Sequence, residues 1–241
     1  LFMIMGRFFS LFSSDRASIA AMINIMSALA SAFTILFLFW TITHLAKKII
    51  LKGQENESWR QWAVFAAGSV GAMAYTFSDT FWFSAVEGEV YAMSSLFTAA
   101  VFWAILKWED VADQPHSNRY LILIAYLMGL SIGVHLLNLL TIPAIGMVYY
   151  YKKFPLTRAN TTKALVISGI ILVGILYGII PGVITVASWF ELLFVNEFGM
   201  SFNSGVIFYI CVLIAAIIYG LWYTLKKEMV ILNTVITVVT V

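Results

Sequence analysis

The positions of the lysine and arginine residues constrain this chain more than any other feature. Twelve of its 14 basic residues fall in four short segments that alternate with long apolar runs. These segments are Lys47–Arg60, Lys107–Arg119, Lys152–Lys163 and Lys226–Lys227. Because basic residues of membrane proteins gather in cytoplasmic loops, we expect all four segments to face the cytoplasm. Only Arg7 and Arg16 are left for the opposite, outer side.

The composition excludes a water-soluble globule. Hydrophobic residues make up 62% of the chain and charged residues 11%, with a mean hydropathy of +0.94. A soluble domain could not cover that much apolar surface, so the chain is predicted to be an integral membrane protein. The formal net charge of +2 gives no indication of a nucleic-acid partner. The one cysteine, Cys211, excludes an internal disulfide and a cysteine-based zinc site.

The apolar runs predict an all-α polytopic bundle with about seven membrane passages and a truncated eighth. We expect one transmembrane domain over 1–241, opening with an outer interfacial segment at 1–16 and containing an outer loop at 189–204. Membrane helices are expected at 17–46, 62–77, 81–107, 120–136, 137–151, 164–188 and 206–225, and a truncated helix from 229 to 241. The chain lacks an initiator Met and stops within an apolar run, so we expect it to be an internal piece of a longer protein.

One stretch is too short for the passages it must contain. Only 32 uncharged residues separate Arg119 from Lys152, although both ends are predicted to be cytoplasmic. Two full crossings need about 40 residues. At least one limb should therefore be short, tilted or re-entrant, with the turn near His135–Thr141.

Acidic residues on the predicted outer side are the first candidates for a functional site. The densest group runs from Asp79 to Glu89, at the outer mouth of the third span. On a continuous helix, three- and four-residue spacing would place five polar residues in one stripe, with Glu89 on the opposite side: Ser84, Glu87, Tyr91, Ser94 and Thr98. A carboxylate there could accept a proton from a hydroxyl, bind a divalent cation or orient a sugar. Alternatively, both glutamates are hydrated surface groups or ion-pair partners of Arg7 or Arg16.

Two further groups of residues have both a functional and a structural interpretation. His135 and Asn138 share a face with Ser131 if the helix continues, yet a single histidine is more often a hydrogen-bonded packing residue. Arg7 and Arg16 could hold a lipid phosphate, or could simply extend toward headgroups. No phosphate loop, zinc-protease pattern or nucleophile elbow appears, so nothing indicates nucleotide hydrolysis.

Three segments carry a resemblance to a known family. Phe77–Met93, Gly129–Leu140 and Met5–Phe12 closely resemble the bacterial membrane proteins of the domain of unknown function 2723. These are similar to protein O-mannosyltransferases of the GT-C class, and the resemblance covers essentially residues 1–150. It implies a GT-C-like bundle in the bacterial inner membrane, with the active face in the periplasm.

The resemblance also implies an activity. A sugar such as mannose would pass from a polyprenyl-phosphate-linked donor to a protein or other acceptor, with membrane lipid as the surrounding partner and no nucleic acid involved. Glu87 and Glu89 would be catalytic, and the substrate would be bound by Asp79, Tyr91, His135, Asn138, Arg7 and Arg16. Any metal requirement, such as a divalent cation, is left open. The family usually carries an acidic stretch before the position where this chain begins, so the main catalytic acid is expected there.

Two other classes of function fit the same pattern. A secondary transporter would also place acids and a broken hairpin near a cavity, and would show inverted repeats, which the sequence does not reveal. A non-catalytic assembly subunit would need none of the outer acids.

Overall fold

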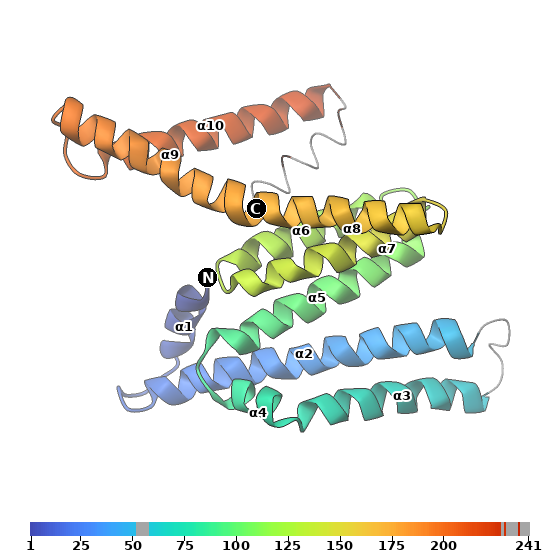
Figure 1. Cartoon of the computed structure of the whole chain (residues 1–241). Helices are drawn as coiled ribbons and strands as arrows, with labels where there is room; N and C mark the ends of the chain where they lie inside the picture. The colour runs from blue at the N-terminus through green and yellow to red at the C-terminus, as the bar shows by residue number, and fades with distance from the viewer. Residues whose placement is uncertain (52–57, 228, 230–235, 237–241) are drawn as a thin grey trace. The chain divides into compact units, whose positions relative to one another are not determined.

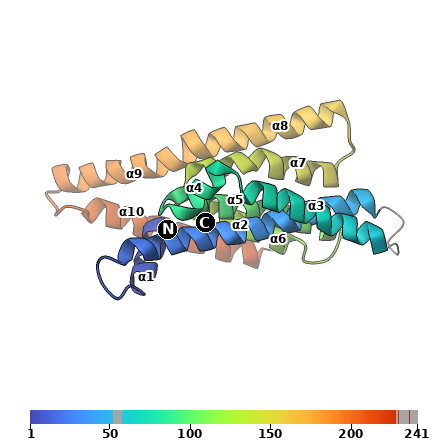
Figure 2. The same ribbon diagram turned by 90° about the horizontal axis from the view of Figure 1, so that it is seen from below.

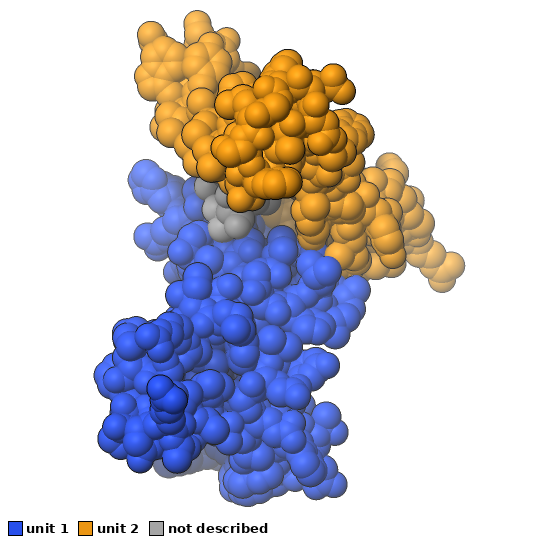
Figure 3. Space-filling model, turned by 90° about the vertical axis from the view of Figure 1, so that its left-hand side faces the viewer, with its two compact units in different colours: residues 1–141 blue, residues 142–241 orange. Residues whose placement is uncertain are grey.

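The computed structural model describes residues 1–51, 58–227, 229 and 236. Within these residues all regular secondary structure is helical, which confirms the predicted all-α class. The chain divides into two compact units, Leu1–Thr141 and Ile142–Val241, coloured separately in Figure 3. Each unit is described by itself below.

Unit 1 is a helical bundle built around α2. Its elements are α1 (Phe2–Ser10), α2 (Ile19–Ile50), α3 (Ser58–Thr76), α4 (Asp79–Val86), α5 (Val90–Val111), α6 (Asn118–Ile132) and the 3-10 helix η1 (Leu136–Thr141). Helix α2 packs against both α3 and α5, and α5 in turn packs against α6 and η1. Figure 1 shows α2 and α5 running in one direction, while α3 and α6 return in the other.

This arrangement gives unit 1 two chemically different ends. One end, here called the basic end, carries the charged termini of the long helices: Lys47, Lys48, Arg60, Lys107 and Arg119. The other, here called the acidic end, carries α1, α4 and the loops with Asp15, Asp79, Glu87 and Glu89. Both ends can be followed in Figures 1 and 2. The alternating basic segments of the sequence that fall in unit 1 therefore gather at one end of the bundle.

Small residues let α3 approach α2 closely. Gly68 and Ala72 are buried on the face of α3 that meets α2. A Cβ atom at Gly68 would collide with the side chain of Thr43 and lie 3.0 Å from the ring of Phe39. Without hydrophobic driving force inside a membrane, such close backbone packing is the usual way in which spanning helices associate.

Unit 2 consists of two helical hairpins. Its elements are α7 (Ile142–Lys153), α8 (Arg158–Val173), the π-helical turn η2 (Gly174–Ile179), α9 (Ile180–Leu192), the π-helical turn η3 (Leu193–Glu197) and α10 (Ser204–Lys226). Helix α7 packs against α8, and α9 packs against α10. The side chain of Thr157 caps α8 by accepting a hydrogen bond from the backbone N–H of Asn160 at 3.1 Å.

Helices α8 and α9 form one continuous helical segment from Arg158 to Glu197, 40 residues long. At the rise of an α-helix this is about 60 Å, roughly twice the hydrocarbon thickness of a bilayer. Pro181 interrupts its hydrogen bonding because proline has no N–H group. The π-helical turn η2 ends at Ile179, two residues before this proline, and absorbs the irregularity. The predicted outer loop at 189–204 is therefore wrong over Trp189–Glu197, which is helical, and the connection shortens to residues 198–203.

A carboxylate closes the α9–α10 hairpin. Glu191 accepts hydrogen bonds from the backbone N–H groups of Asn203, at 2.6 Å, and Val206, at 3.0 Å. Those groups lie at the start of α10, where helical N–H groups lack partners and negative charge is favoured. Asn203 itself is left-handed, with φ of 70°, which allows the tight turn into α10. Glu191, which lies within the predicted outer loop at 189–204, thus serves as a helix cap.

Among the described residues, four helical segments are long and apolar enough to cross a membrane. They are Ile19–Ile50, Val90–Val111, Arg158–Glu197 and Ser204–Lys226. Large apolar side chains on them face outward; Ile170 and Ile184 are each 66% exposed. Such a surface fits hydrocarbon and does not fit water, so the chain is a membrane protein.

The predicted count of seven passages with a truncated eighth is not supported. Helix α3 carries Arg60 and Gln61 and is rich in small residues, which lowers its hydropathy. Helices α6 and α7 have only 15 and 12 residues, about 22 and 18 Å at helical rise, less than the hydrocarbon thickness. The helix expected from 229 to 241 lies outside the described residues apart from Met229 and Ile236.

Candidate functional site

Residues Glu87, Gly88 and Glu89, here called the glutamate loop, interrupt the predicted helix 81–107. Glu87 and Glu89 are extended, with ψ angles of 140° and 167°, and the N–H of Glu89 donates a hydrogen bond to the carbonyl of Glu87 at 2.8 Å. Helix α4 ends at Val86 and α5 begins at Val90. The predicted five-residue stripe is therefore wrong for its first two members, because Ser84 and Glu87 do not share a helix with Tyr91.

Both side chains of the glutamate loop are exposed, and neither forms an ion pair with another described residue. One structural interpretation made these glutamates ion-pair partners of Arg7 or Arg16. In the described part of the chain neither glutamate forms such a pair. Glu89 is the N-cap residue of α5, where the helix dipole favours negative charge. Two solvated carboxylates thus lie two residues apart at the acidic end.

Two of the three remaining members of the stripe, Ser94 and Thr98, form a polar contact between α5 and η1. The hydroxyls of Ser94 and Thr98 donate hydrogen bonds to Oδ1 of Asn138, at 2.5 and 3.0 Å. Asn138 is 2% exposed. Ser94 and Thr98 lie four residues apart on α5, so both hydroxyls reach the same partner. That partner, Asn138, was itself a predicted substrate-binding residue. We call Ser94, Thr98 and Asn138 the amide cluster.

One polar atom of the amide cluster has no partner. The Nδ2 group of Asn138 is buried and makes no hydrogen bond within the described residues. Turning the amide over would pair nitrogen with the two hydroxyls and would leave the oxygen alone instead. In either orientation one polar atom of the buried amide, its nitrogen or its oxygen, makes no hydrogen bond within the described residues. Such an atom costs free energy, and it could bind a water molecule or a ligand hydroxyl.

An aromatic pair lies one turn above the amide cluster. The ring of Tyr91 and the imidazole of His135 are 5.5 Å apart between centroids, at an interplanar angle of 45°. Nδ1 of His135 accepts a hydrogen bond from the N–H of Leu137 at 3.2 Å, so the neutral ring carries its proton on Nε2. Tyr91 is exposed and His135 is half-buried. The shared face of His135 with Ser131 was expected only on a continuous helix, and this condition is not met, because α6 ends at Ile132 before His135.

Replacing Asn138 with alanine tests the amide cluster. The change removes the acceptor of two hydroxyls, the buried one of Ser94 and the half-buried one of Thr98, but these can turn back to carbonyls of their own helix. We therefore expect a loss of about 1–2 kcal/mol in the free energy of unfolding. Thermal melting of the purified protein measures it, with the exposed Asn118→Ala at the opposite end as control. Equal melting temperatures for the two variants would contradict the assignment of a stabilising role to Asn138.

The other predicted substrate-binding residues lie on the short elements of the acidic end. Asp79 is exposed in the first turn of α4. Arg7 is exposed in the last turn of α1, where its guanidinium donates a hydrogen bond to Ser10 at 3.4 Å. Arg16 lies in the exposed loop before α2. Helix α1 contains no buried residue and exposes Met3, Ile4 and Phe8, as expected of a helix lying at a membrane surface.

Asp15, in the same loop as Arg16, has a local partner. Its carboxylate accepts a hydrogen bond from the N–H of Ser18 at 2.8 Å. This hydrogen bond lowers the pKa of the Asp15 carboxyl, because it favours the charged form. Asp15 therefore stabilises the start of α2.

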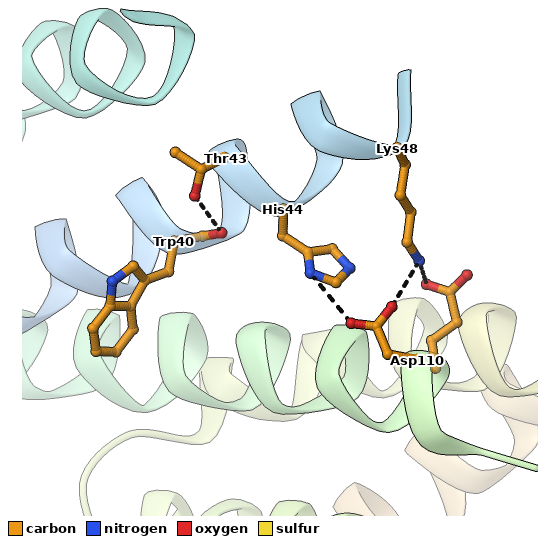
Figure 4. Close-up of polar contacts among 6 residues, drawn as sticks. Trp40, Thr43, His44, Lys48 and Asp110 are labelled. Atoms are coloured by element: carbon orange, nitrogen blue, oxygen red, sulfur yellow. Dashed lines mark hydrogen bonds and ion pairs between the residues drawn. The ribbon is translucent and has the colours of Figure 1, made fainter. Parts of the chain in front are cut away.

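The basic end contains a polar cluster that the sequence analysis did not single out. His44 and Lys48 lie one turn apart on α2 and face two acids at the end of α5 (Figure 4). Lys48 binds Glu109 at 2.7 Å and Asp110 at 3.5 Å, and Nδ1 of His44 lies 3.6 Å from Asp110. Only 11% of the His44 side chain is exposed. Two features of the sequence could have indicated this cluster: His44 and Lys48 lie four residues apart on one helix, and Glu109 and Asp110 are adjacent acids.

An apolar groove of about 280 Å³ lies within unit 1, between α2, α5 and α6. Its lining includes Phe37, Leu96, Trp103 and Leu127. Because its lining is almost entirely apolar, its chemistry suits a hydrocarbon chain. In the described ranges no three His, Cys, Asp or Glu side chains gather so that they could hold a metal ion.

The chain was compared with known proteins. A family model described as the protein O-mannosyl-transferase TMEM260 N-terminal domain matches residues 1–158. No curated protein and no solved structure matches the chain. The matched range contains the glutamate loop, the amide cluster, Arg7 and Arg16.

Proposed function

Because the chain belongs to the protein O-mannosyl-transferase TMEM260 N-terminal domain family, we propose that it forms part of a membrane glycosyltransferase of the GT-C class. The donor is a polyprenyl-phosphate-linked sugar, with mannose as the first candidate, and the acceptor is a protein hydroxyl. We place the chain in the bacterial inner membrane, with its active face in the periplasm. The likeness to the domain of unknown function 2723 is part of the same proposal.

One observation carries this proposal: two solvated carboxylates, Glu87 and Glu89, lie at the acidic end of unit 1, away from its basic end. If the basic end faces the cytoplasm, the glutamate loop opens onto the outer compartment. A protein hydroxyl in that compartment can reach the loop without entering the hydrocarbon.

The chemistry needs a base, a means of holding phosphate and groups that orient the sugar. A carboxylate, Glu87 in the first place, accepts the proton of the acceptor hydroxyl as its oxygen attacks the anomeric carbon. The bond between that carbon and the phosphate oxygen breaks, and polyprenyl phosphate leaves. Glu89 supports the same step from the N-terminus of α5.

The binding roles follow from position. Arg7 and Arg16 hold the phosphate, because they are the basic residues nearest the acidic end and have no carboxylate partner among the described residues. The sugar hydroxyls meet Asp79, Tyr91, His135 and Asn138. The apolar groove along α2, α5 and α6 accommodates part of the hydrocarbon tail.

A transfer assay on membranes tests the proposal. Membranes containing the full-length protein are incubated with tritiated mannosyl polyprenyl phosphate, and membranes without it serve as the control. The proposal expects label on protein only where the chain is present. Label that accumulates inside proteoliposomes instead would favour a transporter, and the absence of both would favour an assembly subunit.

A further inference from the structure

The glutamate loop lies directly against the first turns of α2. A Cβ atom built on Gly88 would lie 2.8 Å from Cγ2 of Ile23, 3.6 Å from Cβ of Ile23 and 3.1 Å from Oδ1 of Asn24. Real Cβ atoms do not approach other carbons to 2.8 Å. The loop can therefore occupy this place only because residue 88 has no side chain.

The neighbouring side chain cannot easily move away. Ile23 lies inside α2, and a β-branched residue in a helix has essentially one allowed χ1 rotamer. Its Cγ2 methyl is therefore fixed to the helix backbone and cannot rotate out of the path of a new Cβ. Only the loop itself could shift, and it carries Glu87 and Glu89 on either side of Gly88.

The backbone of Gly88 places no other demand on this position. Gly199 is the positive-φ glycine of the described chain, so Gly88 does not use the left-handed region. The backbone conformation at position 88 therefore allows alanine, and only the contacts with α2, above all with Ile23, oppose it. This separates the effect of the contact from that of backbone strain.

We infer that Gly88 is a positioning residue, which seats the glutamate loop on Ile23 of α2 and thereby fixes both carboxylates at the acidic end. This inference rests on the proposed function, because the carboxylates matter only if they act on a substrate. A displaced loop would still allow substrate to bind at other contacts, but the base would no longer meet the reacting hydroxyl. Misplacement of a catalytic group by about 1 Å can cost about a hundredfold in rate.

A second-site rescue tests the inference in the full-length protein. We expect Gly88→Ala to lower kcat for transfer from tritiated mannosyl polyprenyl phosphate by about tenfold or more, with less than about a twofold change in KM. Adding Ile23→Ala removes the opposing methyl and should restore kcat to within about threefold of the wild type. Gly169→Ala is the matched control, because a Cβ there meets nothing within 4 Å.

A second readout does not depend on activity. A Glu-specific protease should cut after Glu89 faster in Gly88→Ala than in the double variant Gly88→Ala/Ile23→Ala. These two proteins have the same loop sequence, so a difference in rate reports the position of the loop.

The outcomes separate the inference from the function on which it rests. If Gly88→Ala has a normal kcat, or if Ile23→Ala does not rescue it, the inference is wrong. The proposed function would still stand, provided that the wild-type protein transfers sugar. A wild-type protein that transfers no sugar would overturn the proposed function, and equal cleavage rates in the two loop variants would then show that Ile23 does not seat the loop.

Discussion

Replacing Glu87 with glutamine should lower sugar transfer by at least about a hundredfold, because general-base catalysis contributes a factor of that size or more. Glutamine keeps the shape of the side chain but cannot accept the proton of the attacking hydroxyl. Glu87 is exposed and makes no ion pair in the described residues, so the fold should not depend on its charge. The initial rate of label transfer to protein, normalised to the amount of folded protein, measures the effect.

The control is an acid outside the proposed site. Glu197 is an exposed carboxylate of unit 2, and Glu197→Gln should transfer sugar at the wild-type rate. Wild-type turnover by Glu87→Gln would remove Glu87 from the site. If both variants lost transfer activity equally, the loss would reflect the removal of negative charge in general and would not identify Glu87 as the base.

Replacing Gly205 with alanine should destabilise unit 2 by about 3 kcal/mol, at the upper end of the usual cost of overpacking. A Cβ atom at Gly205 would collide with the backbone carbonyl of Phe190 and with Cα of Glu191. Backbone atoms cannot rotate away as a side chain can. The α9–α10 hairpin would have to separate, which would also stretch the two hydrogen bonds that Glu191 accepts.

Gly182 supplies the matched comparison within the same hairpin. It lies inside α9, and a Cβ atom there meets nothing within 4 Å. Gly182→Ala should therefore be neutral or should stabilise the helix by up to about 1 kcal/mol. Thermal unfolding in detergent compares the two variants. A melting temperature for Gly205→Ala as high as that for Gly182→Ala would show that the hairpin is looser than described.

Hydropathy and charge were sufficient to predict the class of fold. Long apolar runs must form helices in a membrane, because every backbone polar group needs an internal partner there. The spacing of Ser94 and Thr98 was enough to place two hydroxyls on one face of α5, and the hairpin residue Asn138 meets that face.

Tertiary contacts decided what the sequence pattern could not. The segment 81–107 was predicted as one helix. In the structure residues 87–89 separate α4 from α5, and Gly88 lies against Ile23 of α2. Glu191 looks like any outer acid until the start of α10 is brought beside it. His44 is separated from Asp110 by more than sixty residues, so only the packing of α2 on α5 reveals their contact.

The number of passages depended on lengths that hydropathy does not determine. The segment 158–197 reads as a span followed by a loop, because Trp189–Glu197 mixes aromatic and acidic residues. In the structure π-helical turns carry the helix past Pro181 and on to Glu197. Conversely, the 32 residues between Arg119 and Lys152 give two helices too short to span independently.

Cysteine labelling tests most directly the claim that the two ends of unit 1 face opposite compartments. In a Cys211→Ser background, Glu89→Cys and Lys47→Cys are each exposed to a membrane-impermeant maleimide in intact cells. We expect Glu89→Cys to react at once, and Lys47→Cys to react only after the membrane is permeabilised. Labelling of both cysteines from the same side would contradict the orientation, and the proposed site of sugar transfer with it.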